Sequence, residues 1–233
     1  MDDDVPDLER IASGIPGLDD LMEGGFPLNF IILVAGSSGT GKTTLCIQYL
    51  VEGLKHGEKA LYIGLGESSN VMKKAMLRYG IDLEKLAEND RLVFADIPAL
   101  NLEEISQLID RMGPDVKRLV IDPISALLFK FDRDIDLRQK IRELTESIRD
   151  KGVTTLITTE IPENSELISR FGIEDFLADG IVVMYYFREG ARRFRGIEVR
   201  KMRGTAHSDL VHLYKLEPDV GVRVYPNEKA IPE

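Results

Sequence analysis

Apolar residues recur along this chain in two ways, as short unbroken runs and as longer stretches with helical spacing. The short runs are rich in β-branched residues and predict buried strands, at residues 30–35, 60–65, 91–97, 117–122, 154–160 and 180–187. The helical stretches alternate with them, from Thr44 to a stop at Gly57, from Ser68 or Ser69 to Tyr79, at residues 101–112 and at residues 133–151. This alternation predicts a mostly parallel sheet with right-handed crossovers.

The pattern changes after Gly180, where strand-like pieces follow one another with short turns between them. The pieces lie at residues 181–186, 193–203, 210–216 and 220–225 and predict an antiparallel β extension on the edge of the sheet. We see no internal repeat, linker or low-complexity tract. The chain is therefore predicted to form one α/β domain at residues 11–233, preceded by a flexible acidic arm at residues 1–10.

The charge of the chain limits its partners. There are 30 Lys and Arg residues against 40 Asp and Glu residues, which gives a net charge of −10. This field repels nucleic-acid backbones, so it disfavours non-specific DNA binding by a single subunit, although a local basic strip would override it. No apolar run approaches membrane-spanning length, the N-terminus is too acidic for a secretory leader, and the single cysteine, Cys46, has no disulfide partner in the chain. We expect a cytoplasmic protein that does not bind membranes.

Residues 36–43, GSSGTGKT, fit the phosphate-loop pattern G-x-x-x-x-G-K-[ST] without a mismatch. A predicted strand precedes them and a predicted helix follows, and this context distinguishes the motif from a chance glycine-rich turn. The glycines let backbone N–H groups turn toward a polyphosphate, and the helix presents the positive end of its dipole to the same anion. We expect ATP or ADP to contact Ser37, Ser38, Gly39, Thr40, Gly41, Lys42, Thr43 and Thr44.

Side chains for a metal ion can also be assigned. Lys42 is expected to reach the β- and γ-phosphates, and the hydroxyl of Thr43 to bind Mg²⁺. The apolar run LVID ends in Asp122, which would lie at the end of a strand neighbouring the phosphate-loop strand and hold Mg²⁺ through its water shell. The alternative is an ordinary strand-end aspartate in a turn before Pro123.

Hydrolysis would also need a group that orients or deprotonates water. Glu67 follows the second predicted strand, at the sheet edge where the phosphate loop lies, so Glu67 and Lys42 are the predicted catalytic residues. Alternatively, Glu67 only complements the dipole of the helix that follows it. Glu160 ends the fifth strand at the same edge and would sense the γ-phosphate through water, or it is a strand-end surface acid.

A basic segment, RKMRGTAH, occupies residues 200–207. Lys201 and Arg203 alternate, so they share one face of a strand, and a turn then carries His207. These cations lie far along the chain from the phosphate loop, which suggests delivery to a neighbouring subunit's nucleotide, as arginine fingers do in trans. The alternative is a solvated basic edge strand that guards against aggregation. A solvated hairpin is the expected role of the other basic cluster, Arg192, Arg193 and Arg195.

Taken together, these segments resemble the KaiC-like branch of the RecA-type ATPases, over residues 11–226. The matching segments are SGIPGLDDLMEGGFP, GSSGTGKTT, RLVIDP, TTE at residues 158–160, FGIEDFLADGIVVMYY and KMRGTAH. The resemblance implies a RecA-like sheet with nucleotide at the interfaces of a ring, most commonly a hexamer, although filaments occur among relatives. It also implies that Lys201, Arg203 and His207 reach the γ-phosphate held by the next subunit.

Two departures from the family pattern bear on activity. KaiC-like proteins usually carry paired glutamates after the second strand, and the first is taken as the catalytic base. This chain has Gly66 and Glu67 there, so either Glu67 substitutes for the missing glutamate or hydrolysis is slow or absent. The clock kinase of the family carries a Ser-Thr phosphorylation pair before the aspartate that matches Asp179, and here Asp175 and Phe176 stand in its place. The chain also has one ATPase unit where the clock protein has two. Clock-type autokinase activity is therefore not expected.

Three functions follow as hypotheses. The first is an ATP-binding protein with weak Mg²⁺-dependent ATPase activity, whose ring acts as a switch or scaffold for a signalling partner protein. The second is a DNA recombination or repair ATPase of the RecA/RadA type, which would need basic DNA-binding loops. The third is a nucleotide-stabilised interaction protein without turnover, as Gly66 suggests. The preference between ATP and GTP has no readable sequence pattern.

Overall fold

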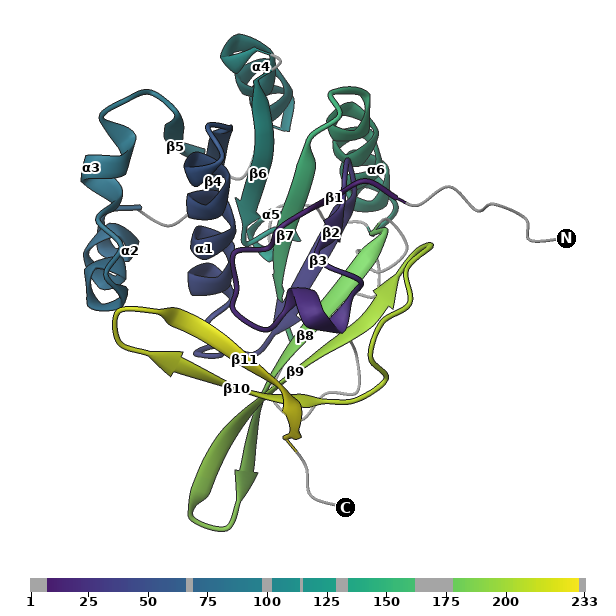
Figure 1. Ribbon diagram of the computed structural model, residues 1–233. Helices are drawn as coiled ribbons and strands as arrows, with labels where there is room; N and C mark the ends of the chain where they lie inside the picture. The colour runs from purple at the N-terminus through teal and green to yellow at the C-terminus, as the bar shows by residue number, and fades with distance from the viewer. Residues whose placement is uncertain are drawn as a thin grey trace, which may run out of the picture.

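The computed structural model describes residues 8–65, 69–97, 102–113, 115–128, 134–161 and 178–230 (Figure 1). Within these residues a nine-stranded sheet runs in the order β11-β10-β9-β8-β3-β7-β6-β4-β5. Its strands are β3 (Ile31–Gly36), β4 (Lys59–Leu65), β5 (Leu92–Ile97), β6 (Val116–Asp122), β7 (Thr154–Glu160), β8 (Gly180–Glu189), β9 (Arg192–Met202), β10 (His212–Glu217) and β11 (Gly221–Lys229).

Helices cover both faces of the sheet. They are α1 (Lys42–Lys55), α2 (Ser69–Met76, extended by a 3-10 turn at Leu77–Tyr79), α3 (Leu83–Ala87), α4 (Leu102–Met112), α5 (Ser125–Leu128) and α6 (Asp134–Asp150). One buried cluster joins one sheet face to α1, α2 and α3, and a second joins the opposite face to α4 and α6. No helix in the described part of the chain has the length and apolarity needed to cross a membrane.

The predicted fold class is confirmed. Strands β5, β4, β6, β7, β3 and β8 pair in parallel, and β9, β10 and β11 add an antiparallel part at the C-terminal end. One detail of the prediction is wrong: residues 181–186, assigned to the edge extension, lie in β8, which pairs in parallel with β3 inside the sheet. The antiparallel part therefore begins at β9, and β8 and β9 together project beyond the other strands as a hairpin (Figure 1).

The predicted position of Asp122 next to the phosphate-loop strand is also wrong. Asp122 ends β6, and β7 lies between β6 and β3. The neighbours of β3 are β7 and β8, and Glu160 of β7 is in register with Gly36 at the end of β3. Chain order alone does not give the order of strands in a parallel sheet, because each crossover can skip a position that a later strand fills.

The first described residues are paired with the body of the domain. Arg10 and Ile11 form β1, which pairs antiparallel with β2 (Phe26–Pro27), and Leu28 N–H donates to Glu9 O at 2.7 Å. The end of the expected acidic arm is thus hydrogen-bonded, and residues 1–7 lie outside the described residues. Helices α3 and α5 were not predicted, since elements of five and four residues are too short to show a helical period.

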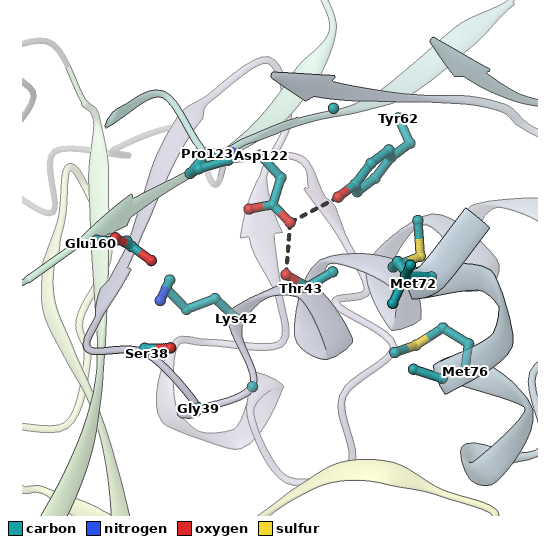
Figure 2. A pocket seen from close by; sticks show the side chains of 14 residues that line it. Ser38, Gly39, Lys42, Thr43, Tyr62, Met72, Met76, Asp122, Pro123 and Glu160 are labelled. Carbon is teal, nitrogen blue, oxygen red and sulfur yellow. Dashed lines mark hydrogen bonds between the residues drawn. The ribbon is translucent and has the colours of Figure 1, made fainter. Parts of the chain in front are cut away.

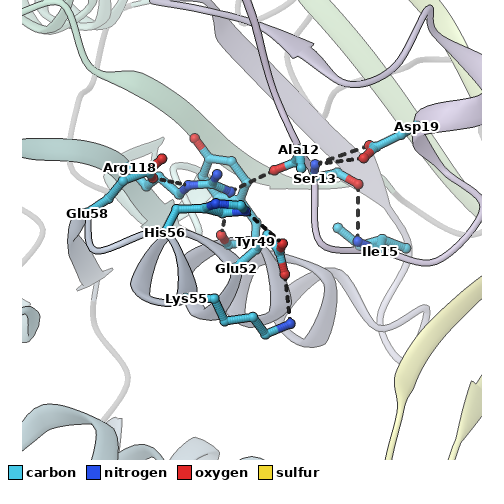
Figure 3. A network of polar contacts seen from close by, with 10 residues as sticks. All are labelled: Ala12, Ser13, Ile15, Asp19, Tyr49, Glu52, Lys55, His56, Glu58 and Arg118. Carbon is cyan, nitrogen blue, oxygen red and sulfur yellow. Dashed lines mark hydrogen bonds and ion pairs between the residues drawn. The ribbon is translucent and has the colours of Figure 1, made fainter.

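A buried arginine fixes the N-terminal segment against the phosphate-loop helix (Figure 3). The side chain of Arg118 on β6 is 1% exposed, and its Nε donates to Glu58 Oε2 at 2.6 Å. Its Nη1 donates to the carbonyls of Ala12 and Tyr49 at 2.8 Å, and the guanidinium lies 4.7 Å from the Tyr49 ring centroid. Because these partners belong to three different segments, the arginine of β6 holds α1 in a fixed position behind the loop.

Candidate functional site

The phosphate loop follows a fully buried strand and ends in the first turn of α1. A Cβ at Gly36 would lie 2.5 Å from Met184 O, so no larger residue fits where the chain leaves β3. Gly41 has φ of 97° and directly precedes α1, a conformation that favours glycine. Thr40 Oγ1 donates to Ser37 O at 2.9 Å and closes the loop on itself.

Lys42 is the first residue of α1 and is 8% exposed. Its Nζ donates to Gly36 O at 2.8 Å and to Ser37 O at 3.0 Å, so the ammonium lies along the loop (Figure 2). Burial lowers the pKa of Lys42, and the carboxylates of Glu160 and Asp122 oppose this shift. An anion entering the loop would therefore meet a poorly hydrated cation, whose attraction for it is strengthened by the low local dielectric.

Asp122 reaches the loop even though its strand is not adjacent to β3. Its Oδ2 accepts from Thr43 Oγ1 at 2.7 Å and from the Tyr62 hydroxyl at 2.9 Å, as Figure 2 shows. Its Oδ1 accepts from the Thr158 hydroxyl. A hydroxyl and a carboxylate held together are the hard oxygen donors that Mg²⁺ prefers, so these residues fit that ion.

These residues line a cavity of about 380 Å³, a size usual for small-molecule sites. One wall is the polar loop with Asp122 and Glu160, and the other is the apolar side of α2 (Figure 2). On that wall Val71 is 75% exposed. The cavity is lined by Ser38, Gly39, Gly41, Lys42, Thr43, Tyr62, Gly64, Val71, Met72, Ala75, Met76, Asp122, Pro123 and Glu160. It thus offers an anion site and an apolar surface side by side.

The two predicted acids differ in what the structure says of them. Glu160 lines the cavity from the end of β7 and lies near Lys42 (Figure 2). Glu67, with its neighbour Gly66, lies outside the described residues. Its role as the water-orienting base stays a prediction.

Several side chains at the loop were missed by sequence reasoning. Tyr62 and Thr158 complete the hydroxyl donors around Asp122. Arg195, assigned to a solvated hairpin, instead lies 4.5 Å from the Tyr186 ring centroid, and its Nη2 donates weakly to Gly39 O at 3.5 Å. Tyr214 on β10 donates to Thr40 O at 2.5 Å. These contacts come from strands far apart in the sequence, so no local pattern could reveal them.

The basic segment lies at the opposite end of the parallel strands, where β3 begins. Met202 pairs with Gly180, which in turn pairs with Ile32, near the start of the phosphate-loop strand. Ile32 and Gly36 are four residues apart along β3, which is roughly 13 Å. Lys201 and Arg203 therefore do not converge with Lys42 and Asp122 on one site within the subunit.

The contacts of the three basic residues are local. Lys201 Nζ donates to Ala178 O at 2.7 Å, and Arg203 Nη1 donates to Asp179 Oδ1 at 3.1 Å. His207 Nδ1 lies 3.3 Å from Ser208 O. The structure thus brings Lys42, Thr43, Asp122 and Glu160 together and keeps Lys201 and Arg203 apart from them.

The strand, loop and helix, with an aspartate reaching the loop threonine, define a P-loop nucleotide-binding protein with a RecA-like sheet. The model of the KaiC ATPase family matches residues 11–229. The chain therefore belongs to the KaiC ATPase family, and the resemblance inferred from its sequence is confirmed.

Individual relatives agree with this assignment. The circadian clock oscillator protein KaiC of Acaryochloris marina is 33% identical over 233 residues, which cover 94% of this chain and 44% of that protein. KaiC of Prochlorococcus marinus is 34% identical over 214 residues, covering 86% and 42%. The chain thus spans less than half the length of these curated relatives. Among solved structures, a KaiC-like protein of Pyrococcus horikoshii superposes with a TM-score of 0.86 at 34% identity, covering 94% of this chain and all of that one.

Proposed function

We propose that this protein is a slow, Mg²⁺-dependent ATPase whose nucleotide lies between subunits of a ring, and that the ring acts as a switch or scaffold for a partner protein. The observation that carries the proposal is the convergence of Lys42, Thr43 and Asp122 in one cavity. The buried ammonium of Lys42 and the hydrogen-bonded oxygens of Thr43 and Asp122 suit a metal-bound triphosphate better than a neutral ligand.

In this proposal the loop N–H groups and Lys42 hold the phosphates, and the apolar side of α2 offers a surface for the base. Thr43 and Asp122 would hold Mg²⁺, which supplies positive charge to the phosphate oxygens when bound. Arg195 approaches the loop from β9, and its Nε is buried without a hydrogen-bond partner among the residues that the structure describes. We infer that it turns to the nucleotide bound in its own subunit.

Turnover requires water to attack the γ-phosphorus while the bond to the β–γ bridging oxygen breaks, which yields ADP and phosphate. Glu67 is the proposed acceptor of the water proton. Glu160 faces the same cavity and would hold a second water near Lys42. Because Gly66 stands where relatives commonly carry the first glutamate, we expect a low rate.

The basic segment near the start of β3 supports a nucleotide site shared between two subunits. Lys201 and Arg203 lie near the start of β3, whereas the subunit's own loop follows its end, so we infer that these two residues and His207 act on a nucleotide held by the next copy. A contact of this kind joins two different surfaces of the same chain, which gives a closed ring or an open filament. The hexamer is the form that the family resemblance implies.

The test is the solution mass with ADP and with a non-hydrolysable ATP analogue plus Mg²⁺, on the natural chain and on Arg203→Ala. We expect the analogue to drive assembly to about six subunits and Arg203→Ala to prevent it. If the natural chain binds the analogue but stays monomeric, the shared site is wrong.

Two other functions remain testable beside this one. The Arg193 and Arg195 guanidiniums both lie over the Tyr186 ring, at 5.3 and 4.5 Å, which is a combination that binds single-stranded nucleic acid elsewhere. Salt-dependent binding to a single strand would favour the recombination-type ATPase, which the net charge of −10 disfavours. An assembly that forms without measurable phosphate release would favour an interaction protein without turnover.

A further inference from the structure

The two residues directly before β8, Ala178 and Asp179, hold two cations of the proposed shared site, Lys201 and Arg203. Ala178 O accepts from Lys201 Nζ at 2.7 Å, and Asp179 Oδ1 accepts from Arg203 Nη1 at 3.1 Å. The backbone repeats the contact, since Arg203 N–H donates to Asp179 O at 3.0 Å. The placement of both cations therefore depends on this short segment.

Asp179 is the centre of the cluster, with a side chain 5% exposed. Arg149, at the C-terminal end of α6, donates from Nη1 to Oδ2 at 2.8 Å and from Nη2 to Oδ1 at 3.1 Å. Ile31 N–H donates to Oδ2 at 3.0 Å. The carboxylate is thus bound on three sides and cannot follow Arg203 if that side chain moves, so it acts as a fixed anchor.

Arg203 is held by Asp179, but most of its N–H groups stay available. Its side chain is 57% exposed, and within the described residues its guanidinium donates to Asp179 alone, through one of its five N–H groups. The remaining groups can bind an anion. Arg149 and Arg203 place two positive charges beside the one carboxylate of Asp179. Without Arg149, Asp179 would neutralise the arginine that it orients.

We propose that Asp179 is the positioning residue for the trans arginine: it aims Arg203 at the γ-phosphate of the next subunit, and Arg149 is the counter-cation that keeps Arg203 attractive to an anion. This inference rests on the proposed function. Asp179 itself touches no nucleotide, because it lies at the amino end of β3 and the loop follows the carboxyl end.

A purely structural role must be distinguished from this one. Asp179 N–H donates to Ile31 O at 2.8 Å while Ile31 N–H donates to its carboxylate, so the residue also pins the start of β3. If that were its whole contribution, a change at Asp179 would damage the phosphate loop of the same subunit. If it positions Arg203, the damage appears at the neighbour's nucleotide.

Mixing two variants separates these cases. Asp179→Asn keeps the shape and loses the charge, and Lys42→Ala damages the loop but leaves the basic edge intact. Each alone should turn over ATP about 10- to 100-fold more slowly than the natural chain, or worse, since a misplaced group costs rates of this size. Mixed in equal amounts before ATP is added, about one interface in four would join an intact loop to an intact basic edge. We therefore expect the mixture to regain up to about a quarter of the natural rate.

The mixture of Arg203→Ala with Lys42→Ala is the reference for the shared site. If it recovers activity and the Asp179→Asn mixture does not, the positioning role is wrong and the proposed function stands. If neither mixture recovers, both are wrong. Glu198→Gln is the matched control, because Glu198 also holds an arginine on β9, Arg200 at 2.6 Å, and this change should leave the turnover rate within about twofold.

Arg149→Gln keeps the experiment decisive if Asp179→Asn fails to fold. Arg149 is 39% exposed, so its loss should be tolerated. It leaves Asp179 paired with Arg203 alone, and we expect the same slow turnover and the same recovery on mixing with Lys42→Ala. A natural rate in Arg149→Gln, or no recovery on mixing, would overturn the role of this cluster.

Discussion

The two ends of β3 carry polar clusters of opposite character. At its carboxyl end, Lys42 and Asp122 are 8% and 7% exposed and are hydrogen-bonded to neighbours from the same subunit. At its amino end, Asp179 is equally buried, but the arginine that it holds is more than half exposed. One end is a formed pocket, and the other displays a cation to the outside.

This difference indicates what each end is built to meet. A buried ammonium with a nearby oxygen pair is organised around a ligand that enters a cavity. An exposed arginine on a buried, fixed carboxylate is organised around a partner that arrives at a surface, since Arg held in place loses less conformational entropy on binding. If the shared site proposed above forms, such subunits would repeat head to tail, each exposed end completing the next pocket.

The largest loss is expected at the carboxyl end, from Lys42→Ala. Removing the buried ammonium takes the cation from the loop, so ATP binding and turnover should both fall to background. Calorimetric titration with ATP and Mg²⁺ measures this. Lys55→Ala is the control, because Lys55 lies on the same helix, is 65% exposed and pairs with Glu52. Undiminished binding by Lys42→Ala would show that the loop is not the nucleotide site.

At the amino end, Arg203→Ala should slow phosphate release about 1000-fold, the lower range of what a trans arginine supplies. ATP binding to the dilute, unassembled subunit should be unchanged, because Arg203 is remote from its own loop. Arg223→Ala is a control in the antiparallel part, where Arg223 pairs with Glu217 at 2.8 Å. Weaker ATP binding by the isolated Arg203→Ala subunit would show that Arg203 acts on the nucleotide of its own subunit.

The pH dependence of ATP binding should come from Lys42, at the carboxyl end of β3. Burial lowers the pKa of Lys42, and bound phosphates would raise that pKa because they favour the charged ammonium. The lysine contribution to affinity is therefore complete below the pKa of the free protein and is lost as the pH rises through the higher pKa of the complex. Titrations in buffers of different ionisation enthalpy should detect proton uptake between these two values. Proton release there would contradict the assignment.

A smaller effect is expected from Tyr62→Phe. Asp122 Oδ2 would keep its bond from Thr43 and lose the one from the phenol, which costs about 1 kcal/mol of stability. We expect a slightly lower melting temperature and a few-fold weaker dependence of ATP binding on Mg²⁺. A loss of ATP binding of more than about 100-fold would mean that Tyr62 contacts the nucleotide directly.

Local patterns gave the strands and the loop, because apolar runs and the glycine-lysine spacing depend on neighbouring residues alone. The contact between Thr43 and Asp122 follows even from a wrong strand order, since parallel strands all end at one edge. Arg195 and Tyr62 were missed because their positions depend on register and strand order, which bring distant segments together.

The cluster around Asp179 also could not be predicted from local sequence patterns. The sequence drew attention to Asp179 only by comparison with a phosphorylation pair nearby, whereas its partners Ile31, Arg149 and Arg203 come from three separated segments. No spacing rule connects them. The cluster becomes visible only when β8 is placed beside β3.

Strand β9 runs from the phosphate loop to the cluster around Asp179. Arg195 lies at the subunit's own loop, and Arg203 follows the end of the strand at the opposite edge. Eight residues of extended chain span roughly 26 Å. If Arg203 meets the next nucleotide, the length of β9 sets the spacing between consecutive nucleotides, in a closed ring and in a filament alike. Insertions and deletions should then be excluded from this strand, even where single substitutions are tolerated.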